Sequence, residues 1–197
     1  MSAVRYYCAM SLDGFIAESD DTLDWLRGYE GTYDAAEAGN GGGYERFYEQ
    51  VGALVMGSVT YEWVLAELQD WPYSGKPAWV LSSRDLPLPD GQDVDVRVVD
   101  APVPELFHEM VASAGERDLW VVGGGNVASQ FADHGLVDQV EVTVVPVVLG
   151  SGKPLFDRRL PGGPMQLLDI RSTPSGMVEL RYEVVGPDSG AKTGRLS

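Results

Sequence analysis

Short apolar runs alternate with amphipathic segments along most of this chain, and that alternation restricts the fold more than any other feature. Runs rich in β-branched and aromatic residues predict strands at 4–10, 53–56, 78–81, 94–99, 119–122 and 140–148. Apolar side chains at helical spacing predict helices at 44–51, 60–68, 104–114 and 127–133. Alternating strands and helices favour an α/β fold, in which helices cover both faces of a mainly parallel sheet.

The C-terminal part of the chain departs from this alternation. Residues 166–171 and 177–185 flank Pro174-Ser175-Gly176, a pattern that predicts a terminal hairpin at an antiparallel edge of the sheet. We therefore expect one three-layer domain over residues 1–186. Residues 187–197, which contain Gly, Ser and Lys, are expected to form a flexible tail.

Charge and rare residue types exclude several classes of function. The net charge of −16 argues against nucleic-acid binding and against anchoring to anionic membranes, because both need clustered Lys and Arg. The single cysteine, Cys8, can form neither an internal disulfide nor a multi-thiolate metal site. His108 and His134 are the only histidines, so we expect no metal site and no serine triad. No run of 18 apolar residues occurs, and we expect a cytoplasmic protein.

A strand that ends in three glycines is the strongest local signal. The predicted strand at 119–122 runs into Gly123, Gly124, Gly125 and Asn126, and a helix follows at once. Glycines let backbone N–H groups approach a phosphate, and a helix N-terminus adds about half a positive charge. A pyrophosphate could therefore bind in an acidic protein, although the same glycines could form a tight turn with positive φ. The spacing departs from G-x-G-x-x-G, so the usual dinucleotide-binding unit fits poorly.

Two further predicted strands end in small or polar residues, and ligands bind at the carboxyl ends of parallel strands. These residues are Gly57, Ser58 and Thr60 after the first strand, and Ser82, Ser83 and Arg84 after the second. Arg84 could pair with a 2′-phosphate, which would favour NADPH over NADH. Thr60 could equally cap a helix, and the two serines could be ordinary turn residues.

Five motifs in this order resemble those of a known superfamily. They are AMSLDGFIA (9–17), VMGSVTYE (55–62), LSSR (81–84), VVGGGNV (121–127) and PVVLGSGKPLF (146–156). Over about residues 4–185 the chain resembles the dihydrofolate-reductase-like superfamily, and within it the reductase domain of bacterial riboflavin-biosynthesis deaminase–reductases. The resemblance implies an NADPH-dependent reductase with a largely parallel eight-stranded sheet, commonly assembled as a homodimer.

The resemblance also implies roles for particular residues. Cofactor contacts are implied for Ile16, Ala17, Gly57, Ser58, Thr60, Ser82, Ser83, Arg84, Val122, Gly123, Gly124, Gly125, Asn126 and Val127. The peptide bond between Gly123 and Gly124 is expected to be cis. The candidate substrate contacts are Trp25, Phe47, Pro146, Gly150 and Lys153, with Lys153 as a point charge for a substrate phosphate.

One departure concerns the catalytic acid. Dihydrofolate reductases place a carboxylate early in the first helix, before the Met-Gly pair, to bind and help protonate the pterin. The corresponding place here falls in Gly41-Gly42-Gly43, with Glu37 and Glu45 as the nearest acids. Asp24, beside Trp25, is another candidate for the catalytic acid. A folate substrate is therefore in doubt, and Ser58 stands where the resemblance would place a cofactor-binding Arg.

These observations predict hydride transfer from NADPH to a C=O or C=N bond of a small heterocycle, with a proton from ordered water or Asp24. The specific form is a 5-amino-6-(5-phosphoribosylamino)uracil reductase of riboflavin biosynthesis. The alternatives are a non-catalytic nucleotide-binding module of the same fold, or a dihydrofolate or pterin reductase. One Cys cannot supply the zinc site of a deaminase. We expect a homodimer that contacts its partner through the terminal hairpin and the 140–148 strand.

Overall fold

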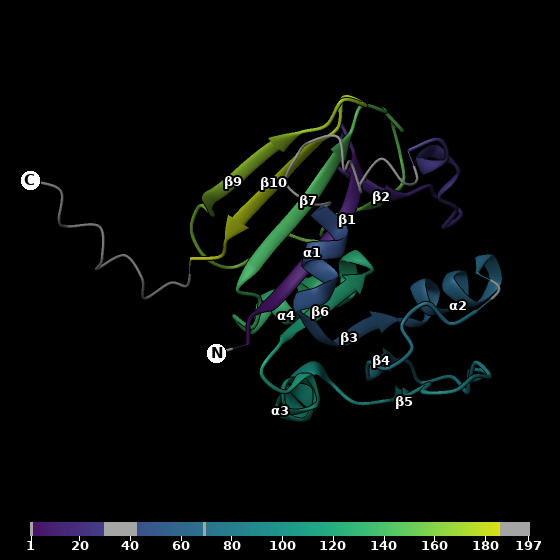
Figure 1. Cartoon of the computed structure of the whole chain (residues 1–197). Helices are drawn as coiled ribbons and strands as arrows, with labels where there is room; N and C mark the ends of the chain where they lie inside the picture. Colours follow the sequence, from purple (N-terminus) through teal and green to yellow (C-terminus); the bar gives the residue numbers. More distant parts are fainter. Residues whose placement is uncertain (1, 30–42, 69, 186–197) are drawn as a thin grey trace, which may run out of the picture.

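A single sheet runs through the part of the chain that the computed structural model describes, residues 2–29, 43–68 and 70–185 (Figure 1). Eight strands of these residues pair in the order β5-β4-β3-β6-β1-β7-β10-β9. Their bounds are Val4–Ser11 for β1, Val51–Gly57 for β3, Ala78–Leu81 for β4, Val96–Val99 for β5, Asp118–Gly123 for β6, Gln139–Val145 for β7, Gln166–Ser172 for β9 and Val178–Glu183 for β10.

Strand direction changes at the C-terminal side of the sheet. The strands from β5 across to β7 pair in parallel, whereas β10 is antiparallel to both β7 and β9. The mainly parallel sheet with a terminal hairpin, predicted from the sequence, is therefore confirmed. The expected strand at 140–148 ends early, at Val145, because Pro146 has no N–H group for the ladder.

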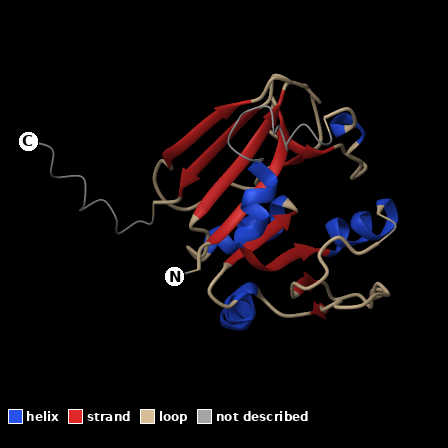
Figure 2. Cartoon of the chain, in the orientation of Figure 1, coloured by secondary structure: helices blue, strands red, loops and turns tan. Residues whose placement is uncertain are grey.

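Helices cover both faces of the sheet, which gives the three layers predicted from the sequence (Figure 2). Helices α3 (Val103–Ala114) and α4 (Gly125–Asp133) pack in one hydrophobic cluster, and α1 (Gly43–Gln50) and α2 (Ser58–Glu67) pack in another. Strand β3 serves both clusters because its side chains alternate in direction: Val55 belongs to the first and Met56 to the second. Fully burying such a side chain contributes about 1.5–3 kcal/mol.

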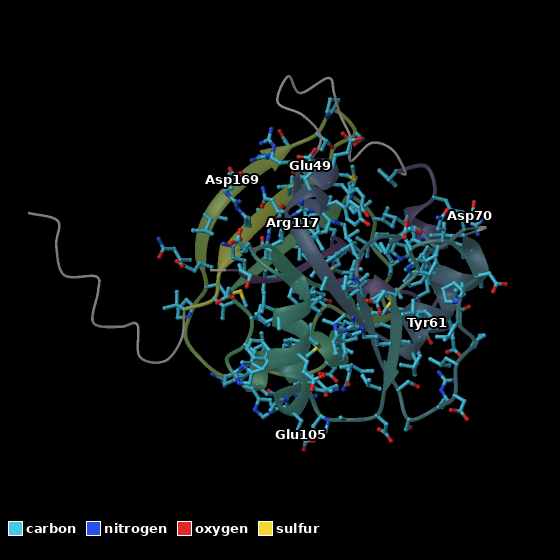
Figure 3. The ribbon with its side chains drawn as sticks, turned by 60° about the horizontal axis from the view of Figure 1, so that its bottom comes forward. Glu49, Tyr61, Asp70, Glu105, Arg117 and Asp169 are labelled. Carbon is cyan, nitrogen blue, oxygen red and sulfur yellow. The ribbon has the colours of Figure 1, made fainter. Side chains whose placement is uncertain are left out.

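The buried side of α2 shows how a helix is fixed to the sheet. Tyr61, labelled in Figure 3, is fully buried. Its hydroxyl donates a hydrogen bond of 2.6 Å to the carbonyl of Pro87, in the segment between β4 and β5. The phenol is thus satisfied inside the apolar layer, and α2 is held over the carboxyl ends of β3 and β4.

Helix starts differ from the sequence prediction in a consistent way. Helix α2 begins at Ser58 and α4 at Gly125, each two residues before the expected start. The predictions relied on the first apolar side chain, whereas the backbone turns helical as soon as the strand ends. The expected tail at 187–197 lies outside the described residues, so the division into domain and tail stays a prediction.

A small second sheet and a short helix stand beside the carboxyl ends of the central strands. Strand β2 (Phe15–Ala17) pairs antiparallel with β8 (Lys153–Pro154), and the 3₁₀ helix η1 covers Asp24–Leu26. The β1–β2 turn is joined to the loop after β7 by Asp13. Its carboxylate accepts hydrogen bonds from the Ser11 hydroxyl at 2.7 Å and from the backbone N–H groups of Leu149 and Gly150 at 3.1 and 2.7 Å.

Loss of the Asp13 carboxylate should loosen this junction. The hydrogen bond from Ser11, followed by those from the two backbone N–H groups, lowers the pKa of Asp13 to about 2. A lowered folded-state pKa contributes stability that is present above the ordinary carboxyl pKa, about 4, and is lost as the pH falls toward 2. We therefore expect Asp13→Asn to lower the melting temperature at pH 7, and the difference from the wild type to shrink between pH 4 and pH 2.

Thermal melts across that pH range, followed by circular dichroism, measure the effect. The exposed Asp90→Asn exchange is the control and should leave the melting temperature unchanged. A difference for Asp13→Asn that stays constant down to pH 2 would contradict the role of its charge.

Candidate functional site

A cleft of about 730 Å³ opens where β1 and β6 end. Residues of β2, η1, α2, α4 and β8 also line it. The cleft therefore lies at the carboxyl ends of parallel strands, where ligands bind in open α/β sheets.

Glycines form the polar floor of the cleft. Strand β6 ends at Gly123, Gly124 is the N-cap of α4, and no side chain caps this helix. A Cβ built on Gly124 would meet no atom within 4 Å, so this glycine faces open space. A Cβ on Gly125 would instead collide with the carbonyl oxygen of Pro154. One glycine thus opens the cleft, and the next lets β8 pack directly on the helix.

The first turn of α4 leaves backbone N–H groups without partners inside the helix. The N–H of Gly124 donates to Oγ1 of Thr60 at 3.3 Å. A threonine hydroxyl that accepts one hydrogen bond still has its own proton to donate. Gly124, Gly125, Asn126 and Thr60 all line the cleft, and together they offer hydrogen-bond donors without a charged side chain.

Another part of the cleft lining is aromatic. Three tyrosines of the cleft lining contact Trp120 of β6, with ring centroids 6.3 Å away for Tyr7, 6.0 Å for Tyr44 and 5.7 Å for Tyr73. Its indole N–H donates to the carbonyl of Tyr7 at 3.0 Å, which fixes the orientation of the ring. Burial raises the pKa of Tyr73 well above its ordinary value, so this phenol stays neutral.

Two tryptophans from separate elements complete the aromatic walls. They are Trp25 of η1 and Trp63 of α2, and both line the cleft. Cys8 of β1 also lines the cleft. Burial raises the pKa of its thiol to about 12, so it stays protonated at neutral pH and is no nucleophile.

Charged side chains stand at the rim. Lys153 Nζ lies 3.3 Å from an oxygen of Asp21, and both residues line the cleft. Asp157 accepts a hydrogen bond of 2.7 Å from the Asn126 side chain. Burial would raise the pKa of Asp157, but hydrogen bonds from Asn126 and Ser129 and the charge of Arg158 lower it below its usual range.

Ten of the residues predicted from the sequence meet in this cleft. They are Ile16, Ala17, Trp25, Thr60, Val122, Gly123, Gly124, Gly125, Asn126 and Lys153. Their convergence comes from the parallel strand order, which brings motifs far apart in the sequence to one edge of the sheet.

The other predicted residues lie outside the cleft lining. Gly57 and Ser58 stand at the β3–α2 junction, next to Thr60. Ser82, Ser83 and Arg84 follow β4, and the Arg84 guanidinium makes two hydrogen bonds to Glu62, at 3.0 and 2.7 Å. Val127 is buried in the core. Pro146 and Gly150 belong to the loop after β7.

Phe47 and Asp24 are also outside the lining. The Phe47 ring is buried and stacks on Tyr7 at 4.3 Å between centroids. The Asp24 carboxylate is 64% exposed and pairs with Arg27 at 2.9 Å, although the neighbouring Trp25 reaches the cleft. Of the other two acids considered, Glu45 is exposed in the first turn of α1, and Glu37 lies outside the described residues.

The peptide bond expected to be cis is trans. No cis peptide occurs among the described residues, and this includes the bond between Gly123 and Gly124. The prediction was transferred from the resemblance, and no residue pattern in this chain had required it.

Sequence reasoning missed most of the aromatic wall. Tyr7, Tyr44, Trp63, Tyr73 and Trp120 were interpreted as core positions or left unassigned, yet all line the cleft. One signal was available: Trp120 and Val122 are two residues apart in a strand, so they share a face, and that face leads directly to the glycine turn.

Neither a membrane span nor a metal cluster stands out in the described part of the chain. None of its helices is long and apolar enough to cross a membrane. Its His, Cys, Asp and Glu side chains form no group that could hold a metal ion.

Comparison with known proteins gives one consistent match. A family model for the RibD C-terminal domain matches residues 69–178. YwjB, an uncharacterized protein of Bacillus subtilis, is 34% identical over 151 residues, which cover 76% of this chain and 80% of that protein. A proposed riboflavin biosynthesis protein from Shewanella sp. PV-4 has a solved structure with a TM-score of 0.76 and 30% identity, covering 93% of this chain and 99% of that one.

A more distant likeness agrees with the predicted fold. Dihydrofolate reductase from Enterococcus faecalis, solved with NADP(H), has a TM-score of 0.57 and 14% identity over 92% of this chain and 96% of that one. Because the family model covers more than half of the sequence and the fold agrees over nearly all of it, this chain belongs to the RibD C-terminal domain family.

Proposed function

We propose that this protein is an NADPH-dependent reductase that transfers hydride to a C=O or C=N bond of a small, pyrimidine-like heterocycle. One observation carries the proposal: an uncapped helix N-terminus, opened by Gly124, adjoins an aromatic wall inside one cleft. The family membership and the fold support the proposal. Dihydrofolate reductase from E. faecalis, which has the same fold, was solved in complex with NADP(H).

The residues of the glycine floor fit a dinucleotide diphosphate. A Cβ at Gly124 would fill the space next to the helix N-terminus, and glycine leaves it open. The N–H groups of Gly125 and Asn126 and the hydroxyl of Thr60 would donate to the phosphate oxygens. Ile16 and Ala17 would lie along the nicotinamide. When bound, the nicotinamide supplies the hydride, and the protein orients it and excludes water.

The adenosine end of the cofactor would extend past Gly57 and Ser58 toward the segment after β4. There Ser82 and Ser83 would approach the ribose, and Arg84 the 2′-phosphate. In the structure Glu62 holds Arg84 through two hydrogen bonds. Discrimination between NADPH and NADH would therefore depend on how easily Arg84 leaves Glu62.

Of the two proton sources that the sequence leaves open, the geometry favours water. Asp24 is largely exposed and pairs with Arg27 outside the cleft lining. Asp157 lines the cleft, but its lowered pKa keeps it ionised at neutral pH, so it has no proton to give. Water entering at the open rim would supply the proton after hydride transfer.

A negative charge at the floor should weaken cofactor binding without weakening the fold. Val59 is the second residue of α2, is 50% exposed and lines the cleft. An acid in the first helical turn favours the helix, but it would repel the diphosphate. We expect Val59→Asp to raise the Kd of NADPH at least about tenfold, or about 1.4 kcal/mol, while the melting temperature of the free protein stays within error of the wild type.

Calorimetric titration and thermal melts measure the two quantities. Val148→Asp is the matched control, because Val148 is 67% exposed and lies outside the cleft lining. In the wild type, NADPH at about 100 times its Kd should stabilise the fold by about 2.7 kcal/mol. No stabilisation by any nicotinamide dinucleotide would remove the cofactor from the proposal.

Freeing Arg84 should shift the cofactor preference. Glu62→Gln removes the charge that holds the guanidinium, so Arg84 becomes available to a 2′-phosphate. We expect the preference for NADPH over NADH, measured as the ratio of kcat/KM values, to rise about fivefold, which corresponds to about 1 kcal/mol. Asp95→Asn is the control, because it frees Arg97 in the same way at another place. An unchanged ratio in Glu62→Gln would place the 2′-phosphate elsewhere.

We also propose that the chain forms a homodimer through β9. The sequence predicts two contact surfaces, the strand at 140–148 and the terminal hairpin. The first corresponds to β7, which lies inside the sheet between β1 and β10. The hairpin contains β9, which forms one edge of the sheet and carries Asp169, labelled in Figure 3. Three apolar side chains on this edge are exposed: Leu167, Leu168 and Ile170. Exposed apolar residues on an edge strand favour pairing with another chain.

Sedimentation velocity tests the dimer. Ile170 is 61% exposed, and Ile170→Lys should raise the dimer dissociation constant at least about tenfold, or about 1.4 kcal/mol. Leu88→Lys, at a residue 62% exposed in the loop after β4, should leave it unchanged. A wild-type protein that sediments as a monomer at all concentrations would end this part of the proposal.

A further inference from the structure

We infer that the substrate part of the cleft accepts a flat, conjugated ring system that carries no phosphate group. The inference rests on the proposed function and narrows its substrate class. It departs from the phosphoribosyl substrate expected from the sequence, because apolar and aromatic side chains make up most of the cleft lining, and the one cation in the lining among the described residues pairs with a carboxylate.

The shape of the site comes from aromatic side chains on six different segments. They are Tyr7 of β1, Trp25 of η1, Tyr44 of α1, Trp63 of α2, Tyr73 after α2 and Trp120 of β6. Tyr7, Tyr73 and Trp120 are buried by contact with one another, so their positions are fixed before any ligand arrives. Tyr44 and Trp63 are half-buried, and both line the cleft.

A preformed wall of this kind favours flat ligands. Aromatic rings bind other π-systems through stacked and edge-to-face contacts, and the ligand loses little conformational freedom. Val64, Leu23 and Leu26 also line the cleft and add apolar contacts. A ribityl or ribosyl phosphate chain would meet these apolar side chains and find few hydrogen-bond partners there.

Charge at the rim argues against a phosphate on the substrate. Among the described residues that line the cleft, Lys153 is the only cation, and it lies 3.3 Å from Asp21. A phosphate that approached Lys153 would also approach this carboxylate, and Asp157 adds a second negative charge to the lining.

The backbone N–H groups at the floor of the cleft already have a ligand in the proposed function, the cofactor phosphates. The N-termini of α4 and α2, which meet where Gly124 donates to Thr60, would both face the cofactor phosphates, and each carries only about half a positive charge. A second, doubly charged group next to them would face the first phosphate pair as well as the carboxylates of the rim. An uncharged ring meets neither repulsion, so it is the substrate class that this lining fits.

Calorimetric titrations with two kinds of probe test the inference, on the full chain with and without saturating NADP⁺. The first pair is 5-amino-6-(5-phosphoribosylamino)uracil and the same compound after removal of its phosphate. The second probe is lumichrome, a flat, uncharged fused-ring compound. We expect removal of the phosphate to change Kd less than threefold, and lumichrome to bind at least tenfold more tightly than either compound.

Substitutions at Trp63 test whether lumichrome binds against the aromatic side chains of the cleft. Trp63→Ala should weaken lumichrome binding at least tenfold, whereas Trp63→Phe, which keeps a flat ring, should weaken it less than threefold. Lys153→Gln should change the Kd of all three probes less than threefold, and Val148→Ala is the remote control. Unchanged melting temperatures show that the variants are folded.

Two results would overturn the inference. One is tenfold or tighter binding of the phosphorylated compound over its dephosphorylated form, with that advantage lost in Lys153→Gln. The other is no saturable binding of lumichrome. Failure of NADP⁺ itself to bind would instead contradict the proposed function, so the titrations with and without the nucleotide tell the two failures apart.

Discussion

The direct passage of β6 into α4 is the constraint on which the rest of the site depends. At Gly125 the carbonyl of Pro154 packs where any other residue would carry a Cβ, so β8 and the helix start are held together. At Gly124 the side facing the cleft is empty. The same two residues therefore close one side of the junction and open the other. Strand β8 also pairs with β2, the strand that follows β1. This pairing places Ile16 and Ala17 of β2 in the cleft lining.

Backbone donors matter in this protein because many cations of the described residues already pair with carboxylates. The chain has 14 Lys and Arg residues against 30 acids, and many of the arginines pair with carboxylates. Arg5 is the clearest case: it is buried and contacts Asp118 and Glu141, where it helps to hold the central strands together. A helix terminus can receive an anion without breaking such pairs, although it supplies less charge than a guanidinium.

The fold could be predicted from the sequence because its signals are local. Strand and helix periods, the hairpin around Pro174-Ser175-Gly176 and the glycine turn all depend on residues that are neighbours in the chain. The glycine floor of the site was found for the same reason. The aromatic wall was missed because it depends on packing between segments: Tyr44 and Trp120 are 76 positions apart, and their ring centroids lie 6.0 Å from one another. The pairings of Arg84 with Glu62 and of Lys153 with Asp21 were equally invisible, since no short-range pattern links the partners.

A crystal structure of the chain with NADP⁺ tests the central claim most directly. The account predicts diphosphate oxygens within hydrogen-bonding distance, about 2.7–3.2 Å, of the backbone nitrogens of Gly125 and Asn126, with the nicotinamide directed toward the aromatic wall. A nucleotide bound away from the start of α4, or held there by side-chain cations in place of the backbone, would contradict it.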